Sequence, residues 1–170
     1  MRRQCRAVLL ILGPLALIVG LGVSGCGWQP PAPRPAPPEN CKDSDGPTAD
    51  SVRRAIAAVP VLVPGSKWVE IGRGHTRNCR LYWVQVIPTI ASESTPQQLL
   101  FFDHNTALGS PTPNPKPYIT VLPAGDETVT VQYQWQVGSD EPCCPTGIGT
   151  VRFQIGSDGK LKALGSIPHQ

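Results

Sequence analysis

The sequence of 170 residues carries 15 Lys and Arg against 12 Asp and Glu, and 16% of its residues are charged. Three of the basic residues lie within the first six positions, so the rest of the chain has 12 basic and 12 acidic side chains. Because no later segment has the cluster of Lys and Arg that binding to phosphates requires, the composition argues against nucleic acid as a partner.

The first 25 residues have the organisation of a secretory signal peptide. A positively charged start precedes an apolar run over residues 7–23, and small residues then lead to Cys26 in the tetrapeptide Val-Ser-Gly-Cys. Glycines and a proline interrupt this run, which argues against its retention as a transmembrane anchor. We therefore predict a lipoprotein signal peptide over residues 1–25 and acylation of Cys26, with palmitate among the acyl groups. The lipid would hold the mature chain on the extracytoplasmic face of the cell membrane.

Residues 26–40 are predicted to be the lipidated cysteine followed by a linker. Six prolines fall within residues 27–40, and such a composition favours the extended polyproline II conformation, which rises about 3.1 Å per residue. The segment would lift the folded part of the chain off the membrane. A second interpretation, a proline-rich ligand for a partner domain, stays open.

Residues 41–170 are long enough to bury a core of their own and are predicted to form one globular domain. A helix is predicted from Thr48 or Asp50 to Val59, because apolar residues recur there with helical spacing and Pro60 ends the pattern. Seven strands are predicted after it, at residues 67–72, 80–87, 98–102, 118–122, 128–137, 149–155 and 160–164.

The strand pattern is clearest over residues 128–137, where apolar and polar side chains alternate. Such alternation indicates one buried and one solvated face. The sequence Ser157-Asp158-Gly159 between two of the predicted strands indicates a hairpin. Strands without intervening helices favour antiparallel pairing, so we predict an α+β fold, mainly antiparallel β-sheet with one N-terminal helix packed on it.

Four cysteines remain beyond the signal peptide and the lipidation site, and an even number in an exported chain predicts two disulfides. Three pairings are possible. Only one of these pairings avoids linking distant segments twice, and it joins Cys41 to Cys79 and Cys143 to Cys144. A bond between adjacent cysteines is strained and easily reduced. The Cys143-Cys144 pair therefore has two interpretations, a redox or ligand-gripping site and a structural staple of a surface loop.

No pattern of catalytic residues stands out, and we predict that the chain is not an enzyme. Asp103 and His104 emerge together after an apolar strand, but a polar turn explains them better. Nucleophile-elbow, zinc-protease and nucleotide-loop motifs are missing from the sequence. Cys143 and Cys144 have no nearby histidine with which to form a zinc site. We predict neither a metal site nor a cofactor.

Aromatic side chains offer a different route to function. Exposed rings on a sheet can stack on sugars or hold an acyl chain. Tyr82 and Trp83 are adjacent on a predicted strand and must point to opposite faces, so at least one lies away from the core or under another element. The candidate ligand-binding residues are Trp68, Tyr82, Trp83, Tyr133 and Trp135, with core packing as the alternative for each.

The order of several motifs resembles a known family. The Val-Ser-Gly-Cys tetrapeptide, the proline-rich segment and a series of strand motifs are similar to the LppP/LprE family of mycobacterial lipoproteins. These strand motifs lie at residues 67–69, 78–84, 99–103, 108–109, 128–135 and 151–153. The resemblance implies an actinobacterial envelope lipoprotein and brings no catalytic residues with it.

The sequence therefore predicts a non-catalytic, membrane-anchored module that binds an envelope lipid, glycan or protein partner. Two alternatives stay open. One is a thiol and disulfide redox protein that works through Cys143 and Cys144, and the other is a structural accessory of a larger envelope complex. A concave pocket with convergent aromatic rings would favour binding, whereas a flat patch without a pocket would favour the accessory role.

Overall fold

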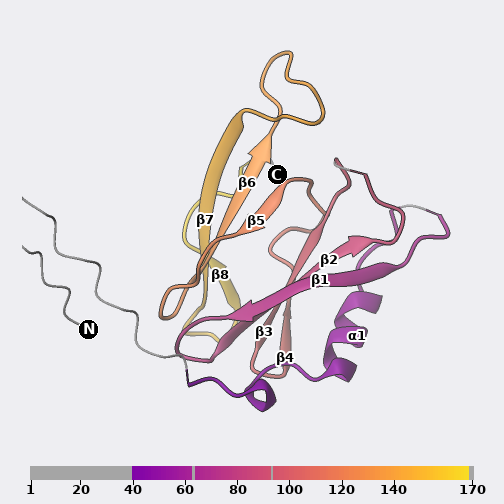
Figure 1. Cartoon of the computed structure of the whole chain (residues 1–170). Helices are drawn as coiled ribbons and strands as arrows, with labels where there is room; N and C mark the ends of the chain where they lie inside the picture. Colours follow the sequence, from indigo (N-terminus) through magenta and orange to yellow (C-terminus); the bar gives the residue numbers. More distant parts are fainter. Residues whose placement is uncertain (1–39, 63, 93, 169–170) are drawn as a thin grey trace, which may run out of the picture. The chain divides into compact units, whose positions relative to one another are not determined.

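The computed structural model describes residues 40–62, 64–92 and 94–168 (Figure 1). The predicted signal peptide, Cys26 and all of the predicted linker except Asn40 lie outside these residues. The described chain contains a 3-10 turn, one α-helix and eight strands. They are η1 (Asp43–Asp45), α1 (Ala49–Ala57), β1 (Trp68–His75), β2 (Leu81–Pro88), β3 (Gln98–Asp103), β4 (Thr106–Gly109), β5 (Ile119–Val121), β6 (Val129–Trp135), β7 (Gly147–Ile155) and β8 (Leu161–Ala163).

The strands form two antiparallel sheets of four, each a meander in chain order. Sheet 1 has the order β1-β2-β3-β4 and sheet 2 the order β5-β6-β7-β8. Every connection within a sheet joins neighbouring strands, as expected of hairpins. Figure 1 shows α1 beside sheet 1 and away from sheet 2.

The main core lies between the two sheets. Sheet 1 contributes Leu81, Leu99 and Phe101, and the Phe101 ring lies 5.4 Å from that of Phe153 in sheet 2. The predicted alternation in β6 is confirmed, because Val129, Val131 and Tyr133 are buried while the residues between them are partly exposed. This inter-sheet cluster consists of Leu81, Leu99, Phe101, Ile119, Val129, Val131, Tyr133, Val151 and Phe153.

Helix α1 covers the other face of sheet 1. Its N-cap is Thr48, whose hydroxyl accepts a hydrogen bond from the Ser51 amide at 3.3 Å. Its apolar side packs on the outer residues of β2 and β3 in a second cluster of Val52, Val59, Tyr82, Val84, Val86, Leu100 and Phe102. Because β3 is buried on both faces and β2 is buried on one face and partly buried on the other, their sequences are apolar almost throughout.

The predicted α+β fold with one helix packed on antiparallel strands is confirmed. Three details differ. The strands divide into two sheets, β4 was not predicted, and the helix ends at Ala57 and not at Val59. The predicted hairpin after β7 is present, and Gly159 takes a positive φ of 74° in its turn.

Candidate functional site

A cleft of about 510 Å³ lies between the N-terminal segment and the edge of sheet 1. We call it the N-terminal cleft. Its size falls within the range of about 300–1,000 Å³ that is usual for small-molecule sites. One wall comes from the chain just before α1, and the other from β1 and the start of β2. The lining residues are Cys41, Lys42, Asp43, Gly46, Pro47, Arg73, Gly74, His75, Tyr82 and Trp83.

The N-terminal wall is fixed at both ends. Cys41 forms a disulfide with Cys79, in the turn between β1 and β2, with 5.3 Å between the Cα atoms. The Thr48 amide donates a hydrogen bond of 2.8 Å to the side-chain carbonyl of Asn105, in the turn between β3 and β4. Gly46 lies so close to Tyr82 that a Cβ atom there would be 2.7 Å from the ring. The wall therefore packs directly against the sheet.

Glycines in β1 give the cleft access to Trp83. Trp83 is paired with Gly74 across the ladder, and a Cβ atom on Gly74 would lie 2.7 Å from the indole. The ring thus lies over a position that has no side chain. Trp135 lies in the same way over Gly147 and close to Gly149 in β7. The Gly-x-Gly sequences at residues 72–74 and 147–149 are therefore places where a strand accommodates a tryptophan ring.

We expect Gly74→Ala to lower the free energy of unfolding by about 1–3 kcal/mol, because the new methyl group must displace the Trp83 ring. Gly72→Ala is the matched control in the same strand, since its Cβ atom would lie 3.7 Å from the same ring, an ordinary contact. Urea denaturation followed by tryptophan fluorescence would compare the two variants. Equal stability of both would contradict this account of the motif.

Tyr82 lies deep in the N-terminal cleft. Only 6% of its surface is exposed, and its hydroxyl has no hydrogen-bond partner in the part of the chain described. The ring lies between those of His75 and His104, with centroid distances of 5.4 and 6.4 Å. Burial raises the pKa of the phenol, and the Asp45 carboxylate acts in the same direction. Tyr82 thus offers a protonated donor to a bound molecule.

The charged side chains of the cleft come from both walls. Arg73 forms a bidentate ion pair with Glu70 on the same strand, and the second contact measures 2.6 Å. Lys42 and Asp43 are exposed on the opposite wall. The His75 imidazole is 3.0 Å from the Thr76 carbonyl oxygen. The cleft therefore combines aromatic surface with donors and acceptors of both charges.

The five aromatic candidates do not form a single site. Tyr82 and Trp83 line the N-terminal cleft, whereas Tyr133 and Trp135 line a separate cavity of about 240 Å³ at one end of sheet 2. Trp68 belongs to the surface under α1, where its indole donates a hydrogen bond of 3.0 Å to the Pro60 carbonyl. Lys42, Asp43, Arg73 and His75 were not predicted as site residues.

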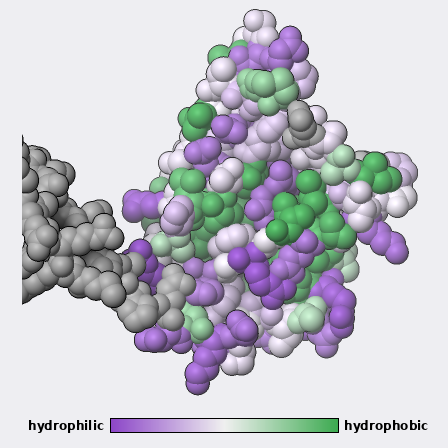
Figure 2. Space-filling model, in the orientation of Figure 1, coloured by the Kyte–Doolittle hydropathy of each residue, from purple (hydrophilic) through white to green (hydrophobic). Residues whose placement is uncertain are grey.

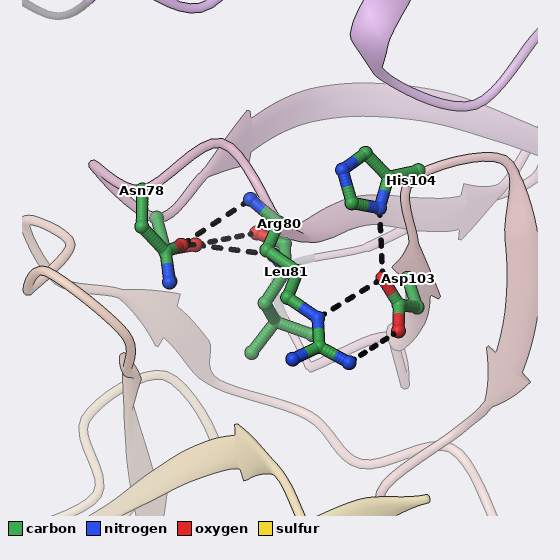
Figure 3. A network of polar contacts seen from close by, with 6 residues as sticks. Asn78, Arg80, Leu81, Asp103 and His104 are labelled. Carbon is green, nitrogen blue, oxygen red and sulfur yellow. Dashed lines mark hydrogen bonds and ion pairs between the residues drawn. The ribbon is translucent and has the colours of Figure 1, made fainter. Parts of the chain in front are cut away.

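Asp103 and His104 belong to a polar network at the end of sheet 1 (Figure 3). The Asp103 carboxylate accepts a hydrogen bond of 3.1 Å from Arg80 and one of 2.8 Å from His104. Nearby, the Asn78 side-chain carbonyl accepts a hydrogen bond from the Arg80 amide. Arg80 lowers the pKa of Asp103. The network joins the β1–β2 turn to the β3–β4 turn, which is the structural interpretation of these residues.

The lowered pKa of Asp103 predicts how stability depends on pH. Asp103 in the folded chain binds its proton less readily than in the unfolded chain, where the pKa is about 3.9. The contribution of Asp103 to the free energy of unfolding is therefore complete above the pKa of the unfolded chain. It is lost as the pH falls through the lower pKa that Asp103 has in the folded chain. Thermal unfolding between pH 2 and 6 should show this loss in the wild type and less of it in Asp103→Asn. Identical profiles for the two would contradict the prediction.

Cys143 and Cys144 lie in the β6–β7 loop, which extends beyond the strand ends in Figure 1. Both side chains are exposed, and they are joined to each other in a disulfide between adjacent residues. The loop is organised by Asp140, whose carboxylate accepts hydrogen bonds of 2.8 and 2.7 Å from the amides of Val137 and Thr146. These hydrogen bonds lower the pKa of Asp140, the Val137 amide first.

No group of three or more His, Cys, Asp or Glu side chains among the described residues is placed to hold a metal ion. No helix in this part of the chain is both long and apolar enough to cross a membrane.

Comparisons with known proteins agree with the family resemblance that the order of the sequence motifs indicated. The chain is 79% identical to proteins from Mycobacterium tuberculosis and Mycobacterium bovis that carry the name lipoprotein LppP. The match covers the full length of this chain and of each of those proteins. No solved structure matches the chain. A family model described as LppP/LprE lipoprotein matches residues 73–158, which run from the cleft strand β1 to the β7–β8 turn. The chain therefore belongs to the LppP/LprE lipoprotein family.

Proposed function

We propose that this lipoprotein is a non-catalytic binding module of the cell envelope that takes its ligand in the N-terminal cleft. A lipid on Cys26 would hold it on the extracytoplasmic face of the cell membrane. Family membership supports a lipoprotein, and the signal-peptide pattern that ends at Cys26 supports the site of acylation.

The observation that carries the proposal is the composition of the cleft. Tyr82 and Trp83 supply aromatic surface, while Arg73, His75 and Lys42 supply polar groups in the same cavity of about 510 Å³. A sugar has both an apolar ring face and many hydroxyl groups, so this combination suits a glycan better than an acyl chain. We therefore propose an envelope glycan as the ligand class.

The proposal of a non-catalytic role rests on Asp103 and His104. Asp103 is already paired with Arg80, so its negative charge is compensated by a guanidinium group. In the described part of the chain, the hydrogen bond of the His104 ring goes to Asp103, and no hydroxyl or thiol is bonded to that ring. This arrangement suits a brace between two turns better than an activated nucleophile, which needs a base within hydrogen-bond reach.

The buried hydroxyl of Tyr82 provides a sharp test. Tyr82→Phe removes one oxygen that has no protein partner among the described residues, so it should not lower stability. If a glycan hydroxyl pairs with it, the substitution should weaken binding about three- to tenfold. Calorimetric titration of the mature chain with oligosaccharides released from a mycobacterial envelope would measure this.

Tyr133→Phe is the matched control, because Tyr133 is the other buried tyrosine with an unpartnered hydroxyl and lies in the separate cavity. It should leave glycan affinity unchanged. Absence of binding to any oligosaccharide fraction, or equal loss of affinity in both variants, would overturn the proposal.

The exposed disulfide in the β6–β7 loop favours a second candidate function. A dithiol partner could reduce Cys143–Cys144 by two electrons, which leaves two thiols on this chain and a disulfide on the partner. Cys143→Ser with Cys144→Ser removes the reaction. If the double variant complements every envelope phenotype of a deletion strain, this candidate is excluded; failure to complement with normal folding would support it.

The accessory role predicted a flat patch and no pocket. An apolar area is present, since Val69 and Ile71 of β1 are 39% and 53% exposed, and Figure 2 shows apolar side chains gathered over β1 and β2. The N-terminal cleft is nevertheless present on the same strand, so we place binding ahead of the accessory role.

A further inference from the structure

The cavity at the end of sheet 2 has a lining of a different kind from that of the N-terminal cleft. Prolines and aromatic residues make up most of its lining, and Lys116 and two glutamines add polar groups. We call it the aromatic groove, defined by Lys116, Pro117, Tyr118, Tyr133, Gln134, Trp135, Gln136 and Pro168. The rings of Tyr118 and Trp135 are half-buried, so their exposed edges face the groove.

The rings of the groove are held by the sheet. Trp135 extends from β6 and lies 3.3 Å from the position that a Cβ atom on Gly149 would take. Pro168 lies 3.0 Å from the same position, so Gly149 leaves space between an indole and a proline ring. The Tyr118 carbonyl accepts a hydrogen bond of 3.2 Å from the Gln134 amide, which fixes Tyr118 beside the end of β6.

A buried donor in the groove lacks a partner. Tyr133 also lines this cavity, is 2% exposed, and its hydroxyl has no hydrogen-bond partner among the described residues. Burial raises the pKa of its phenol far above the ordinary value, so the hydroxyl stays protonated and can only gain by meeting an acceptor. The groove therefore suits a ligand that is rich in carbonyl groups and poor in N–H groups.

A proline-rich segment in the polyproline II conformation is such a ligand. Its prolines lack the backbone N–H, its carbonyl groups point outward, and its rings pack between aromatic side chains. The chain itself contains a proline-rich sequence, Pro-Pro-Ala-Pro-Arg-Pro-Ala-Pro-Pro, at residues 30–38. A single residue, Glu39, separates this sequence from the first described residue, Asn40.

Lys116 lines the groove, so a cation on the ligand is complementary to the acidic β6–β7 loop beside the groove and not to the groove itself. The proline-rich segment carries Arg34 at its centre. The β6–β7 loop carries Asp140 and Glu141, and it is attached to the groove because the Tyr118 hydroxyl donates a hydrogen bond to the Pro142 carbonyl. Asp140 is occupied by amides within the loop, whereas the exposed Glu141 side chain remains for a guanidinium group.

The folded domain begins at Cys41, near the end of sheet 2 that lies opposite the groove. Cys41 is bonded to Cys79, and the neighbouring Asn78 amide donates to the carbonyl of Asp126, in the turn before β6. The groove is at the other end of β6, about 20 Å away for a strand of seven residues. A neighbouring copy on the same membrane would present its segment at high local concentration, a point that rests on the proposed anchoring.

We propose that the aromatic groove binds the proline-rich segment, residues 30–38, of a second copy of this chain. The rings of Trp135 and Tyr118 hold the prolines, the Tyr133 hydroxyl donates to a backbone carbonyl, and Glu141 pairs with Arg34. The segment is then a ligand as well as a spacer, and the copies form chains or closed pairs at the membrane surface.

The test uses the mature chain and a fluorescent synthetic peptide of residues 29–40, with binding measured by anisotropy. We expect saturable binding that weakens at least tenfold when the prolines of the peptide are replaced by serine. Glu141→Lys in the protein should weaken binding of the natural peptide about three- to tenfold, and an Arg34→Glu peptide should recover it. Because the peptide changes leave the protein intact and Glu141 is exposed, misfolding cannot mimic this exchange.

Sedimentation of the mature chain then identifies the source of the segment. Concentration-dependent association that disappears when the prolines at residues 30–38 are replaced by serine supports a second copy. Equal binding of the proline-free peptide, no effect of the charge exchange, or sedimentation as a monomer at every concentration would overturn the proposal. Tyr82→Phe affects the N-terminal cleft alone, so failure of the glycan proposal would be seen separately.

Discussion

Phe101→Ala is expected to lower the free energy of unfolding by about 3–5 kcal/mol. Phe101 is fully buried in β3, and its ring packs on that of Phe153 across the space between the sheets. Alanine would remove most of this contact and leave a cavity that two rigid sheets cannot close. Urea denaturation followed by circular dichroism would measure the loss.

Ile148→Ala is the control for this prediction. It shortens a large apolar side chain on β7 that is 58% exposed, so its effect should stay within about 0.5 kcal/mol. A double variant of Phe101 and Phe153 should show a coupling of about 0.5–1.5 kcal/mol for the ring pair. Strict additivity, or an equal effect of Ile148→Ala, would show that the sheets do not pack through these rings.

Cys41→Ser is expected to lower the free energy of unfolding by about 2–4 kcal/mol. The bond joins positions 38 residues apart and links the segment before α1 to the β1–β2 turn. Without it the unfolded chain gains conformational freedom, and the N-terminal wall of the cleft loses its covalent tie to the sheet. Chemical denaturation of the variant beside the oxidised wild type would measure the change.

A double variant of Cys143 and Cys144 is the comparison for that result. Their disulfide joins adjacent residues and closes almost no chain, so its removal should cost far less stability than that of Cys41–Cys79. Cys79→Ser should match Cys41→Ser, because either change breaks the same bond. A loss below 0.5 kcal/mol in both, or a larger loss in the Cys143 and Cys144 variant, would contradict the account.

Much of the fold follows from local sequence patterns. Helix α1 has a cap, an apolar face and a proline after its end, and β6 has strict alternation. The division into two sheets is not visible in such patterns, because they do not say which strands pair. The segment between β4 and β5 did contain a signal for the break between the two sheets. Prolines alternate there at residues 111, 113, 115 and 117, and a chain that lacks every second N–H cannot continue a ladder.

The candidate site was only partly predictable. Tyr82 and Trp83 could be predicted because they are aromatic residues on a predicted strand. Lys42 and Asp43, which line the same cleft, lie about 40 residues away in the sequence. The Cys41–Cys79 bond, the packing of Gly46 against Tyr82 and the Thr48–Asn105 hydrogen bond hold that segment beside sheet 1. The separation of Tyr133 and Trp135 from this site depends on the two-sheet arrangement. Such placements come from tertiary structure, which local periodicity does not encode.

Native mass spectrometry of the mature chain, purified from a mycobacterial membrane, tests the central claim most directly. The account predicts a bound glycan mass on the wild type and its loss in a Lys42→Ala, Arg73→Ala double variant, which removes two charges from the N-terminal cleft. Lys160→Ala with Lys162→Ala removes two charges elsewhere on the surface and should retain the mass. A wild type without any bound mass, or the same mass on all three proteins, would contradict it.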